Sequence, residues 1–327
     1  MKRFKEILCI VESGKECKSA LDRAVTLAET NQANLTAIMV APLVRAGIGI
    51  PEGGPISTDL QAATVSSYKQ ELEAIAESYR KRVNIETKVL VGTLFLEIIR
   101  EVLRNAHDLV IKCPETLDWL DRIFSSDDMH LLRKCPCPVW LVRQDIGESF
   151  DRILAAVDMD DNYPSKELET RQALNEMVMD LASSLAVSEF AQLHVAHAWD
   201  AIAESALRDG VFTQQPENKV IEYVAQVQQH YAFLLDTLMK EVSTKLGRDV
   251  IDYIKPQIHM PKGSARKVIP VLAKQLEIDC IVMGTVARTG IPGIFMGNTA
   301  ETILDQLQCS VLAIKPPGFV TPVTLED

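Results

Sequence analysis

A repeat of strand-like apolar segments divides the chain into two similar halves. Residues 4–12, which end at Glu12, lie over residues 150–158, which end at Asp158. Four further pairs of segments follow in the same order: 33–40 with 191–198, 89–92 with 258–263, 108–111 with 279–282, and 137–143 with 309–315. The shared order indicates duplication of one structural unit.

Each half contains short apolar runs separated by helix-length segments, with longer helices predicted at about 60–82 and 218–246. This alternation predicts parallel strands with helices on both faces of a sheet. We therefore expect an α/β protein made of two tandem, doubly wound, five-stranded sheets of Rossmann-like type. The expected units are 1–146 and 147–316, joined near residues 144–148 and followed by an extended tail at 317–327.

Length, charge and hydropathy limit the classes of protein that fit. The 327 residues suit two domains of about 150 residues each. The net charge of −11 argues against a nucleic-acid-binding surface, because phosphates would be repelled. The apolar stretch 38–50 is shorter than the roughly 20 residues that span a membrane, and the N-terminal run is too short for a signal-peptide core. We expect no membrane insertion.

The number and positions of the cysteines indicate the cellular compartment of the protein. There are seven, an odd number, and Cys9 and Cys280 lie inside strand-like runs. This pattern is typical of free thiols in a reducing compartment, so the sequence predicts a cytoplasmic protein.

A glycine-rich segment follows the fourth strand of the second half. It contains Gly284 and Gly297 with two further glycines between them, and an expected helix at 300–307 follows. Glycines allow positive φ and a close approach of backbone to a ligand. A loop that leads from a buried strand into a helix N-terminus suits a phosphate, which Arg288 could help to neutralise. The segment therefore predicts a phosphate-binding loop.

The spacing in this loop resembles that of universal stress proteins. Those proteins carry Gly, two residues, Gly, nine residues, Gly, and then Ser or Thr; this chain has Gly284, Ala287, Gly297 and Asn298, with Thr299 next. The strings HLLRKCPCPVWLV, GTVARTG and GNTAETIL are similar to the two-domain, E-type bacterial subfamily. The resemblance covers residues 4–315 and implies a tandem stress-response protein that acts in survival of starvation or DNA damage.

The resemblance also implies a nucleotide ligand such as ATP in the second half. The loop residues would hold the phosphates, Asp158 would lie near the adenine and ribose, and Ala198 would contact the base. Because Ala287 adds a methyl group and Asn298 replaces a hydroxyl, we expect ATP affinity roughly thirtyfold below that of an intact motif. The first-half segment 113–128 has no glycine and has acidic residues at its helix start, which predicts a structural role.

Other functions stay open at this stage. The carboxylates of 158–161 could hold Mg²⁺ and support slow ATP hydrolysis. A nucleotide-sugar or other amphipathic metabolite is an alternative ligand, and a ligand-free regulatory scaffold is a further alternative. No constellation typical of a catalytic nucleophile is present, so we expect at most weak hydrolysis.

Two groups of possible metal or proton-transfer residues have simpler interpretations. Cys135 and Cys137, with His130 and Cys113, could suggest zinc but lack a familiar four-ligand spacing. His194 and His197 stand an odd number of residues apart on a predicted strand, so their side chains should leave opposite faces of the sheet. Packing therefore explains both groups without chemistry.

The last strand of each half offers a way to join the halves. In single-domain relatives these strands pair across a dimer axis, so residues 139–143 and 311–315 should pair in this chain. Such pairing would satisfy backbone groups that an open sheet edge leaves unpaired. We expect an intrachain pseudo-dimer that binds a small phosphate-bearing ligand, with a homodimer also open.

Overall fold

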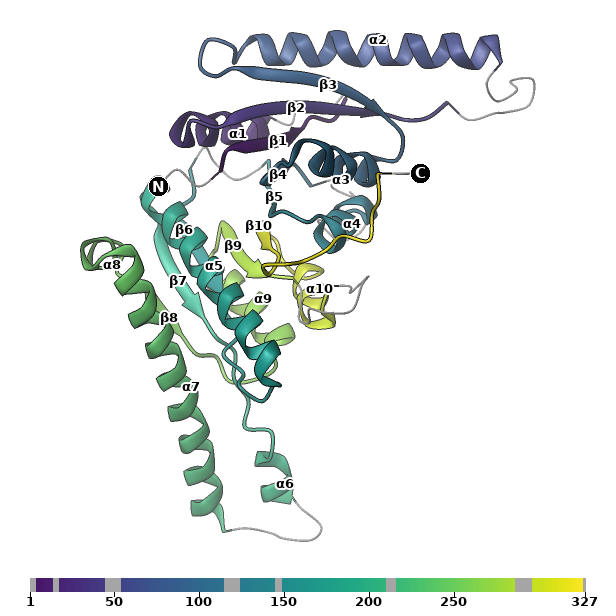
Figure 1. Cartoon of the computed structure of the whole chain (residues 1–327). Helices are drawn as coiled ribbons and strands as arrows, with labels where there is room; N and C mark the ends of the chain where they lie inside the picture. Colours follow the sequence, from purple (N-terminus) through teal and green to yellow (C-terminus); the bar gives the residue numbers. More distant parts are fainter. Residues whose placement is uncertain are drawn as a thin grey trace.

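One sheet of ten strands runs through both halves of the chain (Figure 1). The computed structural model describes residues 4–13, 18–44, 54–114, 124–144, 149–209, 216–285 and 296–325. The first-half strands are β1 (Glu6–Ile10), β2 (Asn34–Ala41), β3 (Ile85–Val91), β4 (Leu109–Lys112) and β5 (Val139–Leu141). The second-half strands are β6 (Arg152–Ala156), β7 (Gln192–Ala196), β8 (Gln257–His259), β9 (Cys280–Gly284) and β10 (Ser310–Ile314).

The strand order confirms the predicted topology. It runs β3-β2-β1-β4-β5-β10-β9-β6-β7-β8, and the strands within each half are parallel. Each half therefore has its first strand between its second and fourth, as doubly wound sheets require. The strand order reverses between β1 and β4 in the first half and between β6 and β9 in the second. Ligands in such sheets bind at these reversal points.

The two fifth strands join the halves. β5 and β10 pair antiparallel, with Leu312 opposite Trp140, which confirms the predicted pairing of these segments. A second contact crosses the same junction, because the Arg23 guanidinium lies 2.6 Å from a Glu189 carboxylate oxygen and 3.8 Å from the Phe150 ring centroid. The halves therefore form an intrachain pseudo-dimer in which the fifth strands lie inside the sheet.

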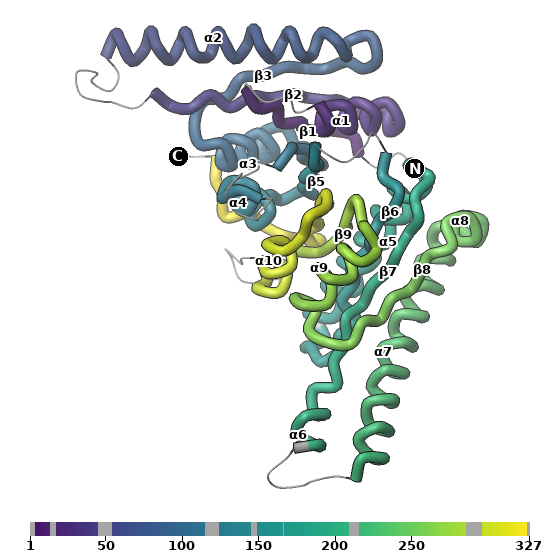
Figure 2. The backbone as a smooth tube through the Cα atoms, turned by 180° about the vertical axis from the view of Figure 1, so that it is seen from behind, coloured from purple at the N-terminus to yellow at the C-terminus, as the bar shows by residue number. Residues whose placement is uncertain are grey.

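Helices cover both faces of this sheet. One face packs against α1 (Lys18–Asn31), α2 (Pro55–Glu77), α5 (Ser165–Glu189), α7 (Glu217–Leu246) and α8 (Arg248–Ile254). The other face packs against α3 (Leu94–Asn105), α4 (Ser126–Lys134), α9 (Ala265–Gln275) and α10 (Asn298–Leu304). The short α6 (Glu204–Asp209) packs on α7. Figure 2 shows the long helices α2 and α7 at opposite ends of the molecule.

The alternation of side chains along each strand builds two apolar cores. In β1, Ile7 and Cys9 belong to the core on the α1 face, whereas Leu8 and Ile10 belong to the other. This division follows from the two-residue period of a strand. Both cores contain residues from both halves, so the halves share their hydrophobic stabilisation rather than folding around separate centres.

Helix boundaries differ from the sequence expectations by a few residues. The helix expected at 60–82 is α2, which begins at Pro55, where the fixed φ of proline favours the first helical position. The helix expected at 218–246 is α7, Glu217–Leu246. The one expected at 300–307 is α10, which begins two residues earlier, at Asn298. Most of the expected junction, 145–148, lies outside the described residues.

The cysteines fulfil the free-thiol prediction only in part. Cys9 and Cys280 are free and buried, as are Cys135, Cys137 and Cys309. Cys113 departs from the expectation because it is disulfide-bonded.

The C-terminal segment returns to the first half. Val323 packs against the core on the α3 face, and the Arg100 side chain donates to the Thr324 carbonyl at 3.4 Å. The expected tail is thus held against the protein over its described part.

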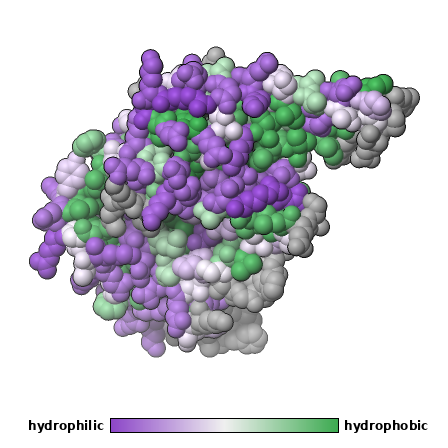
Figure 3. Space-filling view, turned by 45° about the horizontal axis from the view of Figure 1, so that its top comes forward, coloured by the Kyte–Doolittle hydropathy of each residue, from purple (hydrophilic) through white to green (hydrophobic). Residues whose placement is uncertain are grey.

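On the face drawn in Figure 3, hydrophilic side chains predominate, with hydrophobic ones in smaller groups between them. Among the described residues, no helix combines the length and the apolarity needed to cross a membrane.

Candidate functional site

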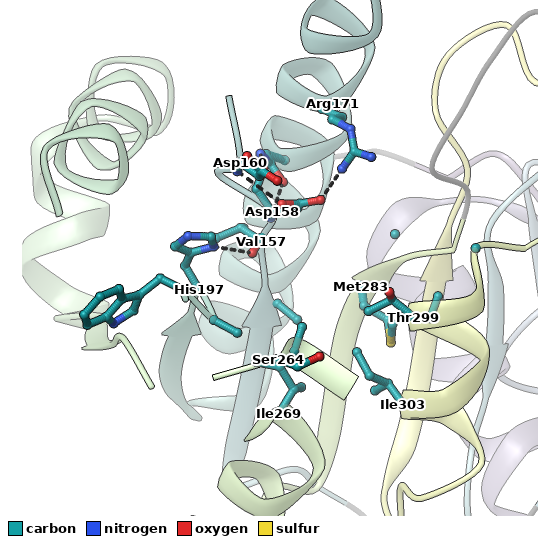
Figure 4. Close-up of a pocket in the computed structure, with 18 of the residues that line it drawn as sticks. Val157, Asp158, Asp160, Arg171, His197, Ser264, Ile269, Met283, Thr299 and Ile303 are labelled. Carbon is teal, nitrogen blue, oxygen red and sulfur yellow. Dashed lines mark hydrogen bonds and ion pairs between the residues drawn. The ribbon is translucent and has the colours of Figure 1, made fainter. Parts of the chain in front are cut away.

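A cavity of about 400 Å³ opens where the strand order of the second half reverses. Its wall includes the ends of β6 and β9, the segment after β7, and the start of α10 (Figure 4). Most of the site residues expected from sequence line it: Asp158, Ala198, Gly284, Gly297, Asn298 and Thr299. Ala287 and Arg288 lie outside the described residues. The fold thus gathers segments that are far apart in the sequence at one place.

Gly284 has a packing reason that the sequence analysis did not foresee. A Cβ atom at this position would lie 2.4 Å from Leu174 Cδ2, so any other residue here would require the Leu174 side chain to shift. The residue is absent from the positive-φ glycines, so conformational freedom is not what requires it. Leu174 of α5 therefore approaches the strand end directly and forms part of the cavity wall.

Gly263 provides the positive-φ position of the site. It follows β8 and has φ +127°, and its counterpart after β3, Gly92, has φ +148°. A side chain in this region of backbone space is strained. The paired segments 89–92 and 258–263 of the repeat thus share a glycine with positive φ.

Asp158 is engaged by a residue that sequence reasoning missed. Arg171 of α5 forms an ion pair with its carboxylate, and the Asp158 peptide N–H donates to Asn175 at 3.0 Å. The Arg171 guanidinium also lies 3.6 Å from the Tyr163 ring centroid and pairs with Glu167. Glu167, Arg171 and Asn175 recur every four residues on one face of α5, and this spacing is the signal that could have identified them.

The carboxylates after Asp158 have separate partners. One Asp160 oxygen accepts from the Asn162 peptide N–H at 3.1 Å, and Asp161 pairs with His230 at 2.7 Å. Within the described part of the chain, no group of three or more His, Cys, Asp or Glu side chains could hold a metal ion. The arrangement of 158–161 therefore gives no support to the expected Mg²⁺ site.

His197 contributes a buried ring to the cavity. Its Nδ1 lies 3.3 Å from the Met159 peptide nitrogen, and its ring centroid is 5.0 Å from that of Tyr231. Burial lowers the pKa of His197, although Asp158 opposes this shift, so the ring is neutral near pH 7. Its Nε2 is buried and has no hydrogen-bond partner among the described residues, which leaves it available to a ligand.

The remaining wall is largely apolar. Trp199 is buried, and its indole N–H donates to the Met260 carbonyl at 3.0 Å, which fixes the ring beside the cavity. Further apolar side chains on the wall are Val178, Ile202, Ile269, Met283 and Ile303. An apolar pocket with a few polar groups is the usual form of a small-molecule site.

Comparisons with known proteins match this architecture over the whole chain. The sequence profile of the Universal stress protein family matches residues 3–143 and again 149–315. The chain belongs to the universal stress protein family. Universal stress protein E of Escherichia coli strain K12 is 30% identical over 331 residues, which cover 100% of this chain and 99% of that relative.

Solved structures agree with this assignment. A putative universal stress protein from Pseudomonas aeruginosa superposes with a TM-score of 0.68 at 26% identity, covering 96% of this chain and 94% of that one. A universal stress protein from Archaeoglobus fulgidus shares the fold, with a TM-score of 0.59 at 14% identity, covering 94% of this chain and 98% of that one.

The first half of this universal stress protein holds a buried ion cluster at the corresponding place. Lys112 ends β4 at the position that Met283 has in β9. Its ammonium nitrogen lies 2.5 Å from Glu12 and 2.9 Å from Asp128, and Glu12 corresponds to Asp158. The two segments that would form opposite walls of a cavity are therefore joined by ion pairs.

Asp128 also fixes the start of α4. The Ser125 hydroxyl accepts from the Asp128 peptide N–H at 3.2 Å, and the Asp128 carboxylate accepts from the Ser125 peptide N–H at 3.0 Å. This capping box satisfies helix N–H groups internally. Asp128 of the acidic helix start thus caps the helix.

The structure also shows the contacts of the two strand histidines and of the possible zinc ligands. His194 Nδ1 lies 3.0 Å from His259 Nε2 on β8, so its partner is not His197. His130 packs on the Phe95 ring, with centroids 4.4 Å apart. Because Cys113 is disulfide-bonded, it supplies no thiolate, and the four possible zinc ligands form no recognised metal group among the described residues.

Proposed function

We propose that this universal stress protein binds a nucleotide or another phosphate-bearing ligand in its second half, and that it acts in stress survival. The observation that carries the proposal is the cavity at the reversal of strand order between β6 and β9. This is the position at which open α/β sheets bind ligands. Family membership supports the stress-response role, and the cavity supplies the site for a ligand.

Different parts of the wall suit different parts of such a ligand. The backbone at Gly297–Thr299 would hold phosphate oxygens, and the outward end near Asp158 would face a sugar. Ala198, Trp199 and His197 would enclose a base, with the unpartnered Nε2 of His197 as a polar contact. Arg171 would balance charge because it already lies beside Asp158.

Binding is proposed for the second half alone. In the first half, the buried ammonium of Lys112 and its carboxylate partners occupy the corresponding walls. We accordingly treat 1–146 as a structural unit, 147–316 as the binding unit and 317–327 as a tail. A cytoplasmic location is part of the proposal; among the described cysteines, five free thiols support it and the disulfide-bonded Cys113 opposes it.

The apolar wall favours a second candidate ligand. Leu174, Val178 and Ile269 present hydrocarbon surface to the cavity, which suits an amphipathic metabolite that carries a phosphate. A nucleotide-sugar conjugate would fit the same description. Mg²⁺-dependent hydrolysis is not part of the proposal, because Asp158 is committed to Arg171.

Paired substitutions in the two halves test the proposal. Gly297→Asp places a carboxylate beside the proposed phosphate position, so ATP binding measured by calorimetry should be lost. Asp127→Ala, at the first-half helix start, should leave ATP affinity unchanged. Both variants should keep the parent's urea midpoint, which shows that each still folds.

Native mass spectrometry of the protein purified without added ligand complements this test. A retained mass that disappears in Gly297→Asp would identify the ligand class. Equal loss of binding in both variants, or tight ATP binding by Gly297→Asp, would contradict the assignment.

A further inference from the structure

Cys135 and Cys137 form a close thiol pair at the end of α4. Their Sγ atoms are 3.6 Å apart, and both residues are buried. A disulfide needs its sulfur atoms about 2 Å apart, so rotation of the side chains would bring these two into bonding distance. The two sulfur atoms are thus close enough to react with one another.

A buried lysine lies beside the pair. Lys315 directly follows β10, and its ammonium nitrogen donates to the Leu132 carbonyl on α4 and to the Thr285 hydroxyl. Burial alone would raise the pKa of the Cys135 thiol, but hydrogen bonds from Cys137 and the charge of Lys315 lower it. The pKa of Cys137 is raised, because Cys135 hydrogen-bonds to it and it is itself buried. Cys135 is therefore the more acidic thiol of the pair.

The other buried cysteines lack these features. Burial raises the pKa of Cys9 to about 12 and that of Cys309 to about 12, and it raises the pKa of Cys280 as well. Cys309 is the repeat counterpart of Cys137, and Leu307 stands where the first half has Cys135. The reactive arrangement belongs to the first half only, and packing alone does not account for it.

We propose that Cys135 and Cys137 are a peroxide-oxidisable dithiol that closes to a disulfide. The Cys135 thiolate attacks one oxygen of hydrogen peroxide, the O–O bond breaks, and the departing hydroxide takes a proton to become water. The resulting sulfenic acid is attacked by the Cys137 sulfur, which forms the S–S bond and releases a second water. Two thiols and one peroxide thus give one disulfide and two waters, and an external dithiol reverses the reaction by exchange.

The same lysine argues against a metal ion on this pair. An ammonium group beside two thiols favours a thiolate anion and opposes a bound cation. Soft metal ions that prefer thiolates would have to displace the Lys315 contacts. Oxidation needs no such displacement.

A short chain of contacts connects the dithiol to the cavity. Lys315 donates to Thr285, and the Thr285 carbonyl accepts from the Gly297 peptide N–H at 3.1 Å. Thr285 and Gly297 both line the cavity. Disulfide formation removes the Cys135 thiolate, whose charge interacts with Lys315. The hydrogen bond from Lys315 to Thr285 should therefore change, and the affinity of the cavity for a ligand should change with it. This consequence rests on the proposed function, whereas the oxidation itself does not.

A single tryptic peptide reports the oxidation. Cleavage after Lys134 and Arg143 gives residues 135–143, which contain both thiols and no other cysteine. The full chain is treated with hydrogen peroxide, alkylated under denaturing conditions and digested. We expect the peptide to lose two hydrogens, to resist alkylation, and to recover both thiols after dithiothreitol. An unoxidised peptide, or a zinc or copper ion retained by the pair in native mass spectra, would overturn the proposal.

Matched variants assign the roles within the pair. Cys137→Ser should stop at a sulfenic acid on Cys135 that dimedone traps, and Cys309→Ser should oxidise at the parent rate. Lys315→Met should slow disulfide formation roughly tenfold, because the rate follows the thiolate fraction, whereas Lys315→Arg should retain most of the rate. If Lys315→Met misfolds by near-UV circular dichroism, the Arg variant and Cys137→Ser decide the outcome. Equal rates in folded Lys315→Met and parent would contradict the role of the ammonium.

ATP calorimetry on reduced and oxidised protein tests the connection to the cavity. Affinity should fall several-fold on oxidation of the parent and should be the same before and after peroxide in Cys135→Ser, which can form neither the sulfenic acid on residue 135 nor the disulfide. If peptide 135–143 oxidises but ATP binds in neither state, the proposed function fails and the dithiol stands. If ATP binds and the peptide never oxidises, the dithiol proposal fails alone.

Discussion

The two halves share a topology but differ in what fills the reversal of strand order. In the second half, Met283 and its neighbours leave a cavity of about 400 Å³. In the first half, Lys112 occupies the strand position of Met283 and pairs with Glu12 and Asp128. A few side chains at the strand ends therefore decide between a binding site and a structural cluster. The strand order itself leaves both outcomes open.

The buried lysines of the two halves extend this contrast. Burial alone would lower the pKa of Lys112, but Asp128 and Glu12 together raise it. Lys315 is also buried, but it donates hydrogen bonds to the neutral oxygens of Leu132 and Thr285, and burial lowers its pKa to about 7. Burial of an ammonium group costs little free energy only where carboxylates accompany it. The first lysine therefore stabilises its site, and the second remains responsive to protonation.

Removal of the first lysine should have the largest effect on stability. Lys112→Met copies the second-half residue but leaves two largely buried carboxylates without their cation, so unfolding free energy should fall by about 3–5 kcal/mol. Urea denaturation at pH 7 measures the change. Lys240→Met, at an exposed pair with Asp236, should cost about 0–1 kcal/mol.

A double variant separates charge from packing at this position. Lys112→Met with Asp128→Asn keeps a capping side chain at the start of α4 and removes one uncompensated carboxylate. It should recover part of the loss. If Lys112→Met alone is as stable as the parent, the ion cluster does not hold the first-half site together.

Filling the glycine position of the second half should have an intermediate effect. Gly284→Ala forces a Cβ atom to within 2.4 Å of Leu174, so unfolding free energy should fall by about 1–3 kcal/mol. Gly284→Ala with Leu174→Ala removes the clashing side chain and should lose less than the sum of the two single changes. Gly247→Ala probes backbone conformation without a clash, because nothing lies within 4 Å of a Cβ atom there. Additive losses at Gly284 and Leu174, measured by urea denaturation, would rule out this packing explanation.

The second buried lysine should give a smaller effect that depends on pH. The pKa of Lys315 is about 7 in the folded protein, below the ordinary value of 10.5, so the unfolded chain binds the extra proton between these values. Stability should therefore rise with pH from about 7 to 9, by at most about 1.4 kcal/mol per pH unit. Over the same range the raised pKa of Lys112 adds no slope, because its stabilisation is lost only above the ordinary value.

Lys315→Met is the matched test of this slope. Urea midpoints at several pH values between 7 and 9 should rise more steeply in the parent than in the variant. Identical slopes would show that Lys315 does not titrate in this range. The lowered pKa of Cys135 contributes in the same direction, so Cys135→Ser in the parent background measures its share.

The general features of this protein could be predicted from local patterns. The repeat predicted two similar halves, the apolar runs predicted parallel strands, and the fifth-strand segments were expected to pair, as β5 and β10 do. The spacing of Gly284 and Gly297 pointed to the place where the cavity lies. The predictions of strands and repeats succeed because the period of apolar residues along a strand is a property of neighbouring residues.

Contacts between distant segments required the tertiary structure. Three such contacts join residues from separate elements: the ion pair of Asp158 with Arg171, the close packing of Leu174 on Gly284, and the ion cluster at Lys112. So does the position of Lys315 beside α4 of the other half. Hydropathy and spacing along the chain record which residues are buried, but not which buried groups meet. The free energy of a buried charge depends on its partners. The sequence alone therefore determined the duplicated sheet, and only the tertiary contacts within each half decided which reversal point is filled and which is open.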